Sequence, residues 1–135
     1  EVAQCNLARS RIAGTIRGIH YQLPPATEQK LVRCTAGEVF DVVVDLRPGS
    51  TTFRQVYHVR LSAENRLGLL IPGGVGHGYQ VMVPNTEIFY MADAFYAPEL
   101  ETGVRFDDPQ LAVPWPLPEG PVADRDRRWP LLAPP

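Results

Sequence analysis

The sequence predicts an all-β protein, an antiparallel barrel of the jelly-roll type. Short runs of β-branched and apolar residues are separated by turn-forming residues about every 8–12 positions, as in sandwiches and barrels. The 135 residues include 14 prolines and 11 glycines, which leave little room for helices of ordinary length. A chain of this length has room for one hydrophobic core. We therefore expect residues 1–135 to form a single β-barrel domain.

The first half of the chain is expected to supply four strands, because β-branched and apolar residues dominate each of these segments. They are residues 1–9, 11–20, 29–34 and 37–46. In the last of them Asp41 and Asp45 are embedded among valines and share one face, since alternate residues of a strand point the same way. The Arg-Pro-Gly-Ser sequence at 47–50 is a turn that ends this strand.

The second half is expected to supply four more strands, at residues 53–61, 67–71, 78–83 and 87–92. The first alternates polar and apolar side chains, and the others are short apolar runs. A turn at 62–65 and the Pro-Gly-Gly sequence at 72–74 separate them. Beyond Pro98 the chain is rich in proline, so we expect an irregular tail that wraps over the barrel with Trp115 as its apolar anchor.

Composition excludes several classes of protein. The net charge of -2 gives no reason to expect nucleic acid or an acidic membrane surface as a partner. No apolar run approaches the roughly 20 residues of a membrane span, and no signal-peptide pattern opens the chain. Cys5 and Cys34 form neither a Cys-x-x-Cys motif nor a disulfide framework. A reducing, cytoplasmic location fits best.

The densest group of polar residues lies in the Gly-Thr-Ile-Arg-Gly-Ile-His-Tyr-Gln sequence of residues 14–22, followed by Lys30. Burying cations inside a barrel is unfavourable unless a partner compensates for the lost hydration. Arg17 and His20 need a twist or a bulge between them to point into one cavity. A solvated strand face is the simpler interpretation for any one of these residues, but together they predict a binding or catalytic cavity.

Two of the three histidines lie in suggestive surroundings. An imidazole titrates near neutral pH and can therefore remove and return a proton. His20 follows Arg17, and His77 lies in a glycine-rich segment that we expect to leave its ring accessible. His58 is expected on the surface of an alternating strand. No His-x-His pair is present, so a metal site is not predicted, although three histidines from separate strands would be an alternative.

Tyrosines and aspartates are the other side chains that are candidates for binding or catalysis. Tyr90 and Tyr96 are six positions apart, hence on one face if the strand is regular, and either line a site or pack as core or rim aromatics. A phenol beside a lysine can donate a proton, which favours Tyr90. A buried Asp41 would need a partner, for which histidine is the natural choice. Asp126 lies in an Ala-Asp-Arg-Asp-Arg-Arg run that looks like a solvated charge cluster.

In their order along the chain, these motifs resemble the dTDP-4-dehydrorhamnose 3,5-epimerase family of nucleotide-sugar epimerases. The resemblance runs from about Gln4 to Leu132, and its segments are 14–22, 30–33, 37–50, 61–65, 71–79, 96–99 and 107–109. It implies a metal-free cupin barrel without a cofactor, usually a homodimer. The implied substrate is dTDP-4-dehydro-6-deoxy-glucose, whose 4-keto group acidifies the flanking C3 and C5 hydrogens, and the product belongs to dTDP-rhamnose biosynthesis.

The resemblance also implies roles for individual residues. His20 is the general base, Asp126 pairs with that base, and Lys30 stabilises the enolate oxygen, a term that is often large in catalysis. Tyr90 is the acid that reprotonates the opposite face. Lining or substrate-binding positions are Arg17, Gln4, Asn6, Tyr96 and a second His–Asp pair, His77 with Asp41.

The sequence departs from the family pattern in two ways, and three alternative functions stay open. Family members carry a further segment ahead of the point where this chain begins, so we expect residues 1–135 to be the cupin-like epimerase domain without it. Glu28 stands where the family usually has glutamine. The alternatives are a single-centre 3- or 5-epimerase for an antibiotic or cell-surface deoxysugar, a non-catalytic cupin module that binds a sugar nucleotide, and a metal-dependent cupin oxygenase or isomerase.

Overall fold

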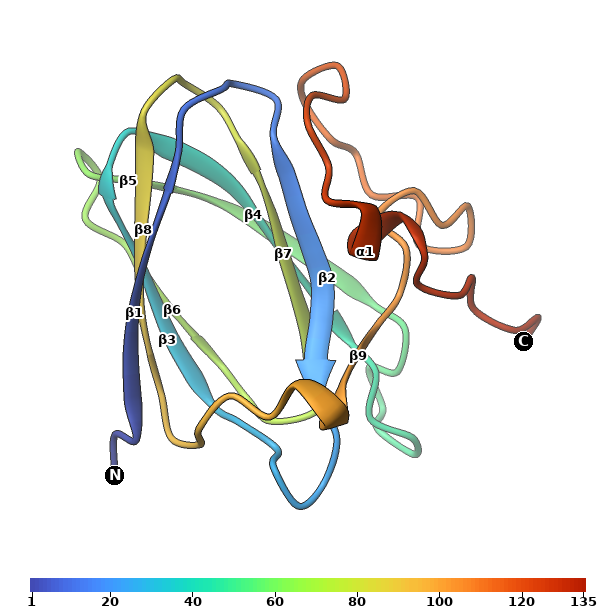
Figure 1. The fold of residues 1–135 in the computed structure, drawn as a ribbon. Coiled ribbons are helices and arrows are strands. Elements are labelled where there is room, and N and C mark those ends of the chain that lie inside the picture. The colour runs from blue at the N-terminus through green and yellow to red at the C-terminus, as the bar shows by residue number, and fades with distance from the viewer.

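The computed structural model describes residues 1–135 and consists almost entirely of strands, which confirms the all-β prediction (Figure 1). The elements in chain order are β1 (Gln4–Ser10), β2 (Ile16–Gln22), β3 (Lys30–Ala36), β4 (Glu38–Asp45), β5 (Val56–Ser62), β6 (Gly68–Ile71), β7 (Val75–Val81), β8 (Thr86–Ala92), the 3₁₀ turn η1 (Pro98–Leu100), β9 (Glu101–Gly103) and α1 (Asp124–Arg127). None of the helices has the length and apolar composition that crossing a membrane requires.

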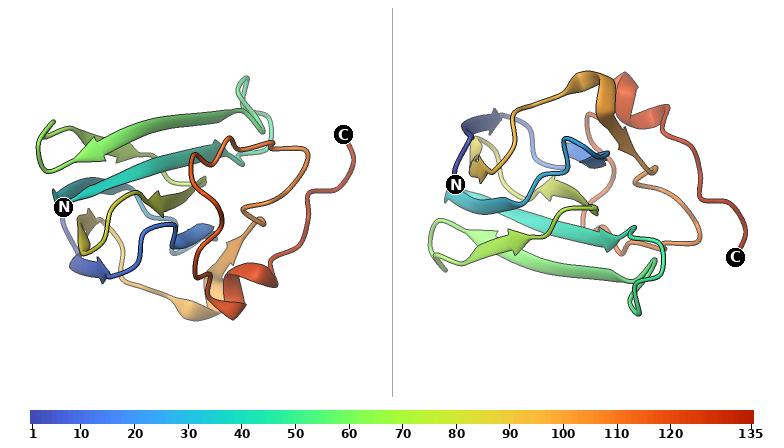
Figure 2. Two further views of the ribbon diagram at one scale, coloured as in Figure 1. Left: turned by 90° about the horizontal axis from the view of Figure 1, so that it is seen from above. Right: turned by 90° about the horizontal axis from the view of Figure 1, so that it is seen from below.

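The strands form two antiparallel sheets that face each other, as the views in Figure 2 show. One sheet has four strands in the order β1-β8-β3-β6, and the other has five in the order β5-β4-β7-β2-β9. Neighbours in each sheet are mostly distant in sequence; for example, β1 pairs with β8 from Gln4↔Ala92 to Ser10↔Thr86. This arrangement places residues from both ends of the chain around one central space.

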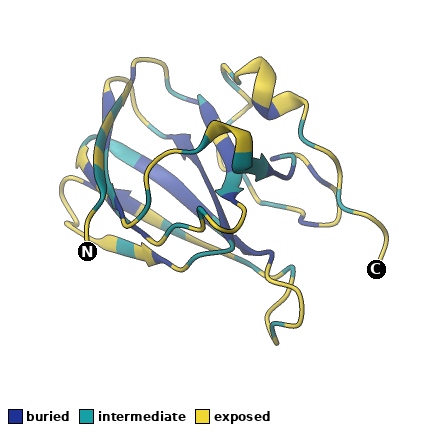
Figure 3. Ribbon diagram, turned by 60° about the horizontal axis from the view of Figure 1, so that its bottom comes forward, coloured by how far each residue is buried: buried dark blue, intermediate teal, exposed yellow.

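The central strands of the five-stranded sheet, β4 and β7, are buried on both faces. The inner face of this sheet packs against the four-stranded sheet around Val32, Val39 and Ile88. The outer face, including Phe40 and Val42, is covered by the C-terminal tail. This double coverage explains why β4 is an almost continuous apolar run, and Figure 3 shows the buried residues concentrated on these central strands.

The tail confirms the role predicted for Trp115. Its ring lies edge-on to that of Phe40, with centroids 6.1 Å apart, and its indole Nε1 donates a hydrogen bond of 2.8 Å to the Phe106 carbonyl. His58, as predicted, is exposed, and it stacks on the same Phe40. The tail after Gly103 contains only the short helix α1.

Several predicted boundaries were wrong. The chain turns at residues 12–14, so the segment 11–20 does not form one strand but leads from β1 into β2. Residues 51–54 extend the preceding turn, which delays the start of β5 to Val56. Strand β7 begins at Val75, inside the glycine-rich segment, because glycines there allow close contact with the neighbouring strand. A Cβ on Gly78 would lie 2.8 Å from the Arg17 carbonyl oxygen.

Candidate functional site

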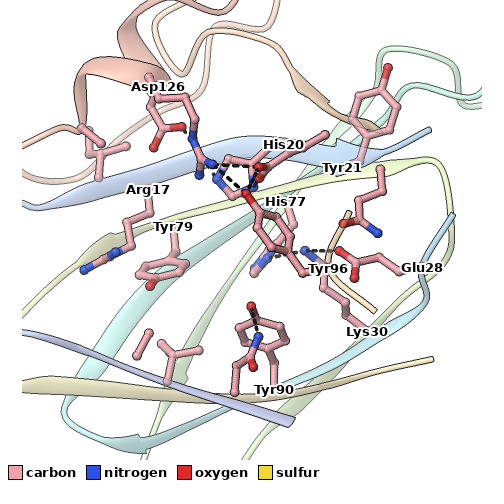
Figure 4. A pocket seen from close by; sticks show the side chains of 18 of the residues that line it. Arg17, His20, Tyr21, Glu28, Lys30, His77, Tyr79, Tyr90, Tyr96 and Asp126 are labelled. Carbon is pink, nitrogen blue, oxygen red and sulfur yellow. Dashed lines mark hydrogen bonds and ion pairs between the residues drawn. The ribbon is translucent and has the colours of Figure 1, made fainter. Parts of the chain in front are cut away.

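A cavity of about 610 Å³ lies between the two sheets and is partly closed by the tail (Figure 4). All of the predicted site residues except Asp41 line it. Asp41 is fully buried behind His77. The fold therefore brings these predicted residues together, although they come from five strands, a loop and the helix α1.

A β-bulge turns Arg17 and His20 into the same cavity, as the sequence required. Strand β2 pairs with β7 at Arg17↔Tyr79, and the register shifts before the next pair, His20↔His77. Gly18 occupies the bulge with a φ of 101°, a backbone conformation that residues other than glycine rarely adopt. In a regular strand Arg17 and His20 would point to opposite faces. The bulge turns both side chains toward the cavity.

His20 lies between two carboxylates. Its Nδ1 is 3.4 Å from Glu101 Oε1, and its Nε2 is 3.7 Å from Asp126 Oδ1. Burial, followed by the nearby cations Lys30 and Arg125, lowers the pKa of His20 to about 3. The imidazole is therefore neutral at pH 7 and has a lone pair available to accept a proton.

The interpretation of Asp126 as part of a solvated charge cluster was wrong, because α1 docks onto β2 and buries this side chain. Its Oδ2 accepts a hydrogen bond of 3.1 Å from the Gly18 backbone N–H, and its Oδ1 accepts one of 3.0 Å from Trp129 Nε1. Asp124, two residues earlier, is exposed. The two aspartates differ only in that the contact of α1 with β2 buries Asp126 and leaves Asp124 exposed.

Lys30, His77 and Asp41 form a buried chain. The Lys30 Nζ is 3.5 Å from His77 Nδ1, and His77 Nε2 is 2.5 Å from Asp41 Oδ1. Because an ionised Asp41 accepts only, we assign the imidazole proton to Nε2, which leaves Nδ1 to accept from the ammonium. Burial lowers the pKa of Lys30, while nearby carboxylates, Glu28 first among them, act in the opposite direction.

The expectation that the glycines leave His77 accessible was wrong. Every residue of β7 is buried, and the two ring nitrogens of His77 face Lys30 and Asp41 rather than solvent. Glu28 also points into the cavity, with its Oε1 3.8 Å from Lys30 Nζ. Burial raises the pKa of Glu28, and the Lys30 ammonium opposes that shift.

Tyr90 lies on β8, in the sheet opposite the one that carries His20. Figure 4 shows the two side chains on opposite walls of the cavity. The Tyr90 hydroxyl accepts a hydrogen bond of 2.6 Å from Asn6 Nδ2, so its own proton remains free for another partner. The Lys30 Nζ lies 5.9 Å from the centre of the Tyr90 ring.

The remaining predicted residues form the rim of the cavity. Tyr96 is not on the strand of Tyr90, as a regular strand would require, but in the loop after β8. Its backbone N–H donates to Gln4 Oε1 at 2.9 Å. Gln4 in turn donates to Asn6, and Arg17 is an exposed cation whose Nε lies 3.3 Å from the Ser10 hydroxyl.

Sequence reasoning missed Glu101 and Arg125. Glu101 Oε2 accepts hydrogen bonds of 2.7 Å from both the Tyr96 hydroxyl and Arg125 Nη1. Neither residue belongs to a motif, and the pairing of β9 with β2, which brings Glu101 to the cavity, leaves no local signal in the sequence.

The three histidines do not form a common metal site. His58 lies on the outer face of the barrel, whereas His20 and His77 lie at the cavity, each beside a carboxylate. The chain has no group of three or more His, Cys, Asp or Glu side chains placed to hold a metal ion. The arrangement is instead a neutral base, a cation and a phenol around one space, which suits proton transfer next to a carbonyl group.

Comparison with known proteins gives a consistent result. The sequence model of the family described as dTDP-4-dehydrorhamnose 3,5-epimerase matches residues 1–134. The dTDP-4-dehydrorhamnose 3,5-epimerase of Pseudomonas aeruginosa is 47% identical over 126 residues, which cover 93% of this chain and 68% of that protein.

Solved structures agree. The Bacillus anthracis dTDP-4-dehydrorhamnose 3,5-epimerase, with TDP and PPi bound, matches with a TM-score of 0.96 at 42% identity, covering 98% of this chain and 75% of the other. The Legionella pneumophila dTDP-6-deoxy-D-glucose-3,5-epimerase, in complex with dTDP-4-keto-L-rhamnose, matches with a TM-score of 0.92 at 42% identity, covering 97% and 69%.

Proposed function

Because the chain belongs to the dTDP-4-dehydrorhamnose 3,5-epimerase family, a family of carbohydrate isomerases with a cupin jelly-roll fold, we propose that it epimerises a dTDP-4-keto-6-deoxy-hexose. The proposed reaction inverts C3 and C5 of dTDP-4-dehydro-6-deoxy-glucose and yields dTDP-4-dehydro-rhamnose. The 4-keto group makes the hydrogens on both neighbouring carbons acidic, so the side chains of the cavity suffice for proton removal and return.

The observation that carries the proposal is the position of a base and an acid on opposite walls of one cavity. His20 projects from β2 of one sheet and Tyr90 from β8 of the other. Inversion needs a proton to leave one face of the sugar ring and another to arrive at the opposite face. A ring held between these two side chains would meet both requirements without turning over.

Each step of the proposed epimerisation can be assigned to a residue of the cavity. Neutral His20 removes the proton, and buried Asp126, 3.7 Å from Nε2, stabilises the imidazolium that forms. The Lys30 ammonium, held by the His77–Asp41 pair, stabilises the negative charge that develops on the C4 oxygen. Tyr90 donates its free proton from the other side.

The rim supplies groups for the nucleotide part of the substrate. Arg17 offers a cation to the diphosphate, and Gln4 and Asn6 offer amides. Tyr96, half exposed at the mouth, offers an aromatic face on which a base could stack. Glu28 lies beside Lys30, and its negative charge would oppose a diphosphate placed there, which favours binding of the sugar, rather than the phosphates, at the Lys30 end.

The test is hydrogen exchange in deuterated water with a dTDP-4-keto-6-deoxy-hexose. We expect the protein to introduce deuterium at C3 and C5 and to release the inverted product, both read by NMR. His20→Ala should abolish exchange, and His58→Ala, the same change at an exposed histidine outside the cavity, should not. Absence of exchange with the unmodified protein would refute the proposal, and inversion at one carbon only would make it a single-centre epimerase.

We also propose that the protein is a homodimer. The outer face of the four-stranded sheet is uncovered, and one row across all four strands is apolar, made of Cys5, Met91, Leu31 and Leu70. The adjacent Leu7 is 62% exposed. A second copy fits this face because a two-fold contact pairs the same apolar patch with itself.

Analytical ultracentrifugation tests the dimer. The unmodified chain should sediment as a dimer and Leu7→Lys as a monomer, whereas Leu131→Lys, an exposed leucine in the tail, should leave the dimer intact. A monomeric unmodified chain would contradict the proposal. A cytoplasmic location stays a prediction of the sequence, with which two free cysteines are compatible.

A further inference from the structure

Glu101 lies where β9 joins the edge of the five-stranded sheet beside β2. The register Gln22↔Glu101 and His20↔Gly103 sets this carboxylate next to the strand that carries the proposed base. Its side chain is only 9% exposed. One oxygen, Oε2, accepts hydrogen bonds from Tyr96 and Arg125, and the other, Oε1, faces His20 Nδ1 at 3.4 Å.

The two carboxylates beside His20 are not equivalent. Both oxygens of Asp126 already accept hydrogen bonds, one from Gly18 and one from Trp129, and Asp126 lies 3.7 Å from the ring, beyond hydrogen-bonding distance. Glu101 Oε1 accepts no hydrogen bond from another residue, and at 3.4 Å from Nδ1 it is the nearer of the two carboxylate oxygens that face the ring. The ring N–H is therefore better matched to Glu101 than to Asp126.

We propose that Glu101 is the positioning residue for His20: its Oε1 accepts the Nδ1–H, which fixes the tautomer that leaves the Nε2 lone pair free to take the substrate proton. Asp126 then stabilises the charge that appears on the ring after the transfer. This inference rests on the proposed epimerase function, in which His20 is the base. The Oε2 contacts with Tyr96 and Arg125 hold the carboxylate in place from the cavity mouth.

Glu101→Gln reverses this arrangement in a way that the structure dictates. Tyr96 and Arg125 are both donors, so the glutamine carbonyl oxygen turns toward them and its NH₂ group faces His20. Nδ1 must then accept, and the proton moves to Nε2. Loss of the correct tautomer or of a supporting carboxylate lowers enzyme rates by about 10² to 10⁴-fold, so we expect deuterium exchange to fall at least about 10²-fold with little change in KM.

The matched control is Glu99→Gln, the same change at an exposed carboxylate of η1 outside the cavity. It should exchange deuterium like the unmodified protein, and Glu101→Asp, which keeps the acceptor, should recover part of the rate lost in Glu101→Gln. Equal exchange in Glu101→Gln and Glu99→Gln would overturn the inference.

A direct measurement does not depend on activity. ¹⁵N NMR of histidine-labelled protein, with the His20 signals assigned by His20→Ala, should show the Nδ1–H tautomer in the unmodified chain and Nε2–H in Glu101→Gln. An Nε2–H tautomer in the unmodified chain would overturn the inference, even if Glu101→Gln did not fold. If the unmodified protein showed no exchange while His20 carried Nδ1–H, the proposed function would fail and the placement of Glu101 would stand.

Discussion

Gly18 connects the fold to the site, and replacing it with alanine tests that connection. A Cβ at this position would lie 2.5 Å from the His77 carbonyl oxygen and 2.7 Å from the Gly78 Cα, both in the backbone of the adjacent strand β7. Neither atom can move aside without shifting a strand that is buried along its whole length. The same residue donates its N–H to Asp126. Gly18→Ala should therefore separate β2 from β7 at the bulge.

The expected loss of stability has two parts. A left-handed φ costs a residue with a Cβ about 1–2 kcal/mol. Overpacking against backbone adds about 1–3 kcal/mol, because strands rather than flexible side chains must shift. The sum is a loss of about 2–5 kcal/mol in the free energy of unfolding. Gly49→Ala is the matched control: its φ is 81°, but a Cβ there meets nothing within 4 Å, so only the first part applies.

Urea unfolding followed by tryptophan fluorescence measures both variants, since Trp115 and Trp129 pack in the tail. Gly18→Ala should also lose deuterium exchange, because the bulge aims His20 and anchors Asp126. If Gly18→Ala were no less stable than Gly49→Ala, the close contact of β2 with β7 would not be what requires glycine. The reasoning from the bulge to the site would then be wrong.

Two further predictions concern single charges. Lys30→Met should lower the rate of exchange by about 10²–10³-fold, as loss of one oxyanion-stabilising donor does, and should also lower the midpoint of thermal unfolding, because Glu28 and His77 lose a buried partner; retained exchange would remove Lys30 from the mechanism. Asp45 accepts hydrogen bonds from Arg47, Ser50 and Thr52, and that from Arg47 above all holds its pKa well below the usual range. Its contribution is therefore present above the ordinary carboxyl pKa of about 3.9 and is lost as the pH falls below it. Asp45→Asn should cost about 1–3 kcal/mol at pH 7, with the difference from the unmodified chain shrinking in acid; a difference independent of pH would contradict this.

The order of strands along the chain and the bulge between Arg17 and His20 were predictable because both follow from local rules. Strand residues alternate, so two cavity residues three positions apart require an irregularity between them. The cluster of Lys30 with His20 was likewise visible as ionisable side chains in apolar surroundings. These features depend only on residues close together in sequence.

What the sequence left open depends on contacts between distant segments. Asp126 and Asp124 look alike in their charge run, but Asp126 is buried and accepts a hydrogen bond from Gly18, 108 residues away, whereas Asp124 is exposed. The burial of His77 depends on the four-stranded sheet packing against β7. Glu101 reaches the site through the pairing of β9 with β2, which no spacing in the sequence records.

The central claim is that a base and an acid act from opposite walls of one cavity, and Tyr90→Phe tests it most directly. This variant keeps His20 and Lys30 but removes the phenolic proton. In deuterated water we predict that NMR will find deuterium at the exchangeable carbons of recovered substrate whose configuration is unchanged. Inverted product formed at the unmodified rate would contradict the account, because the second proton would then come from somewhere other than the Tyr90 wall.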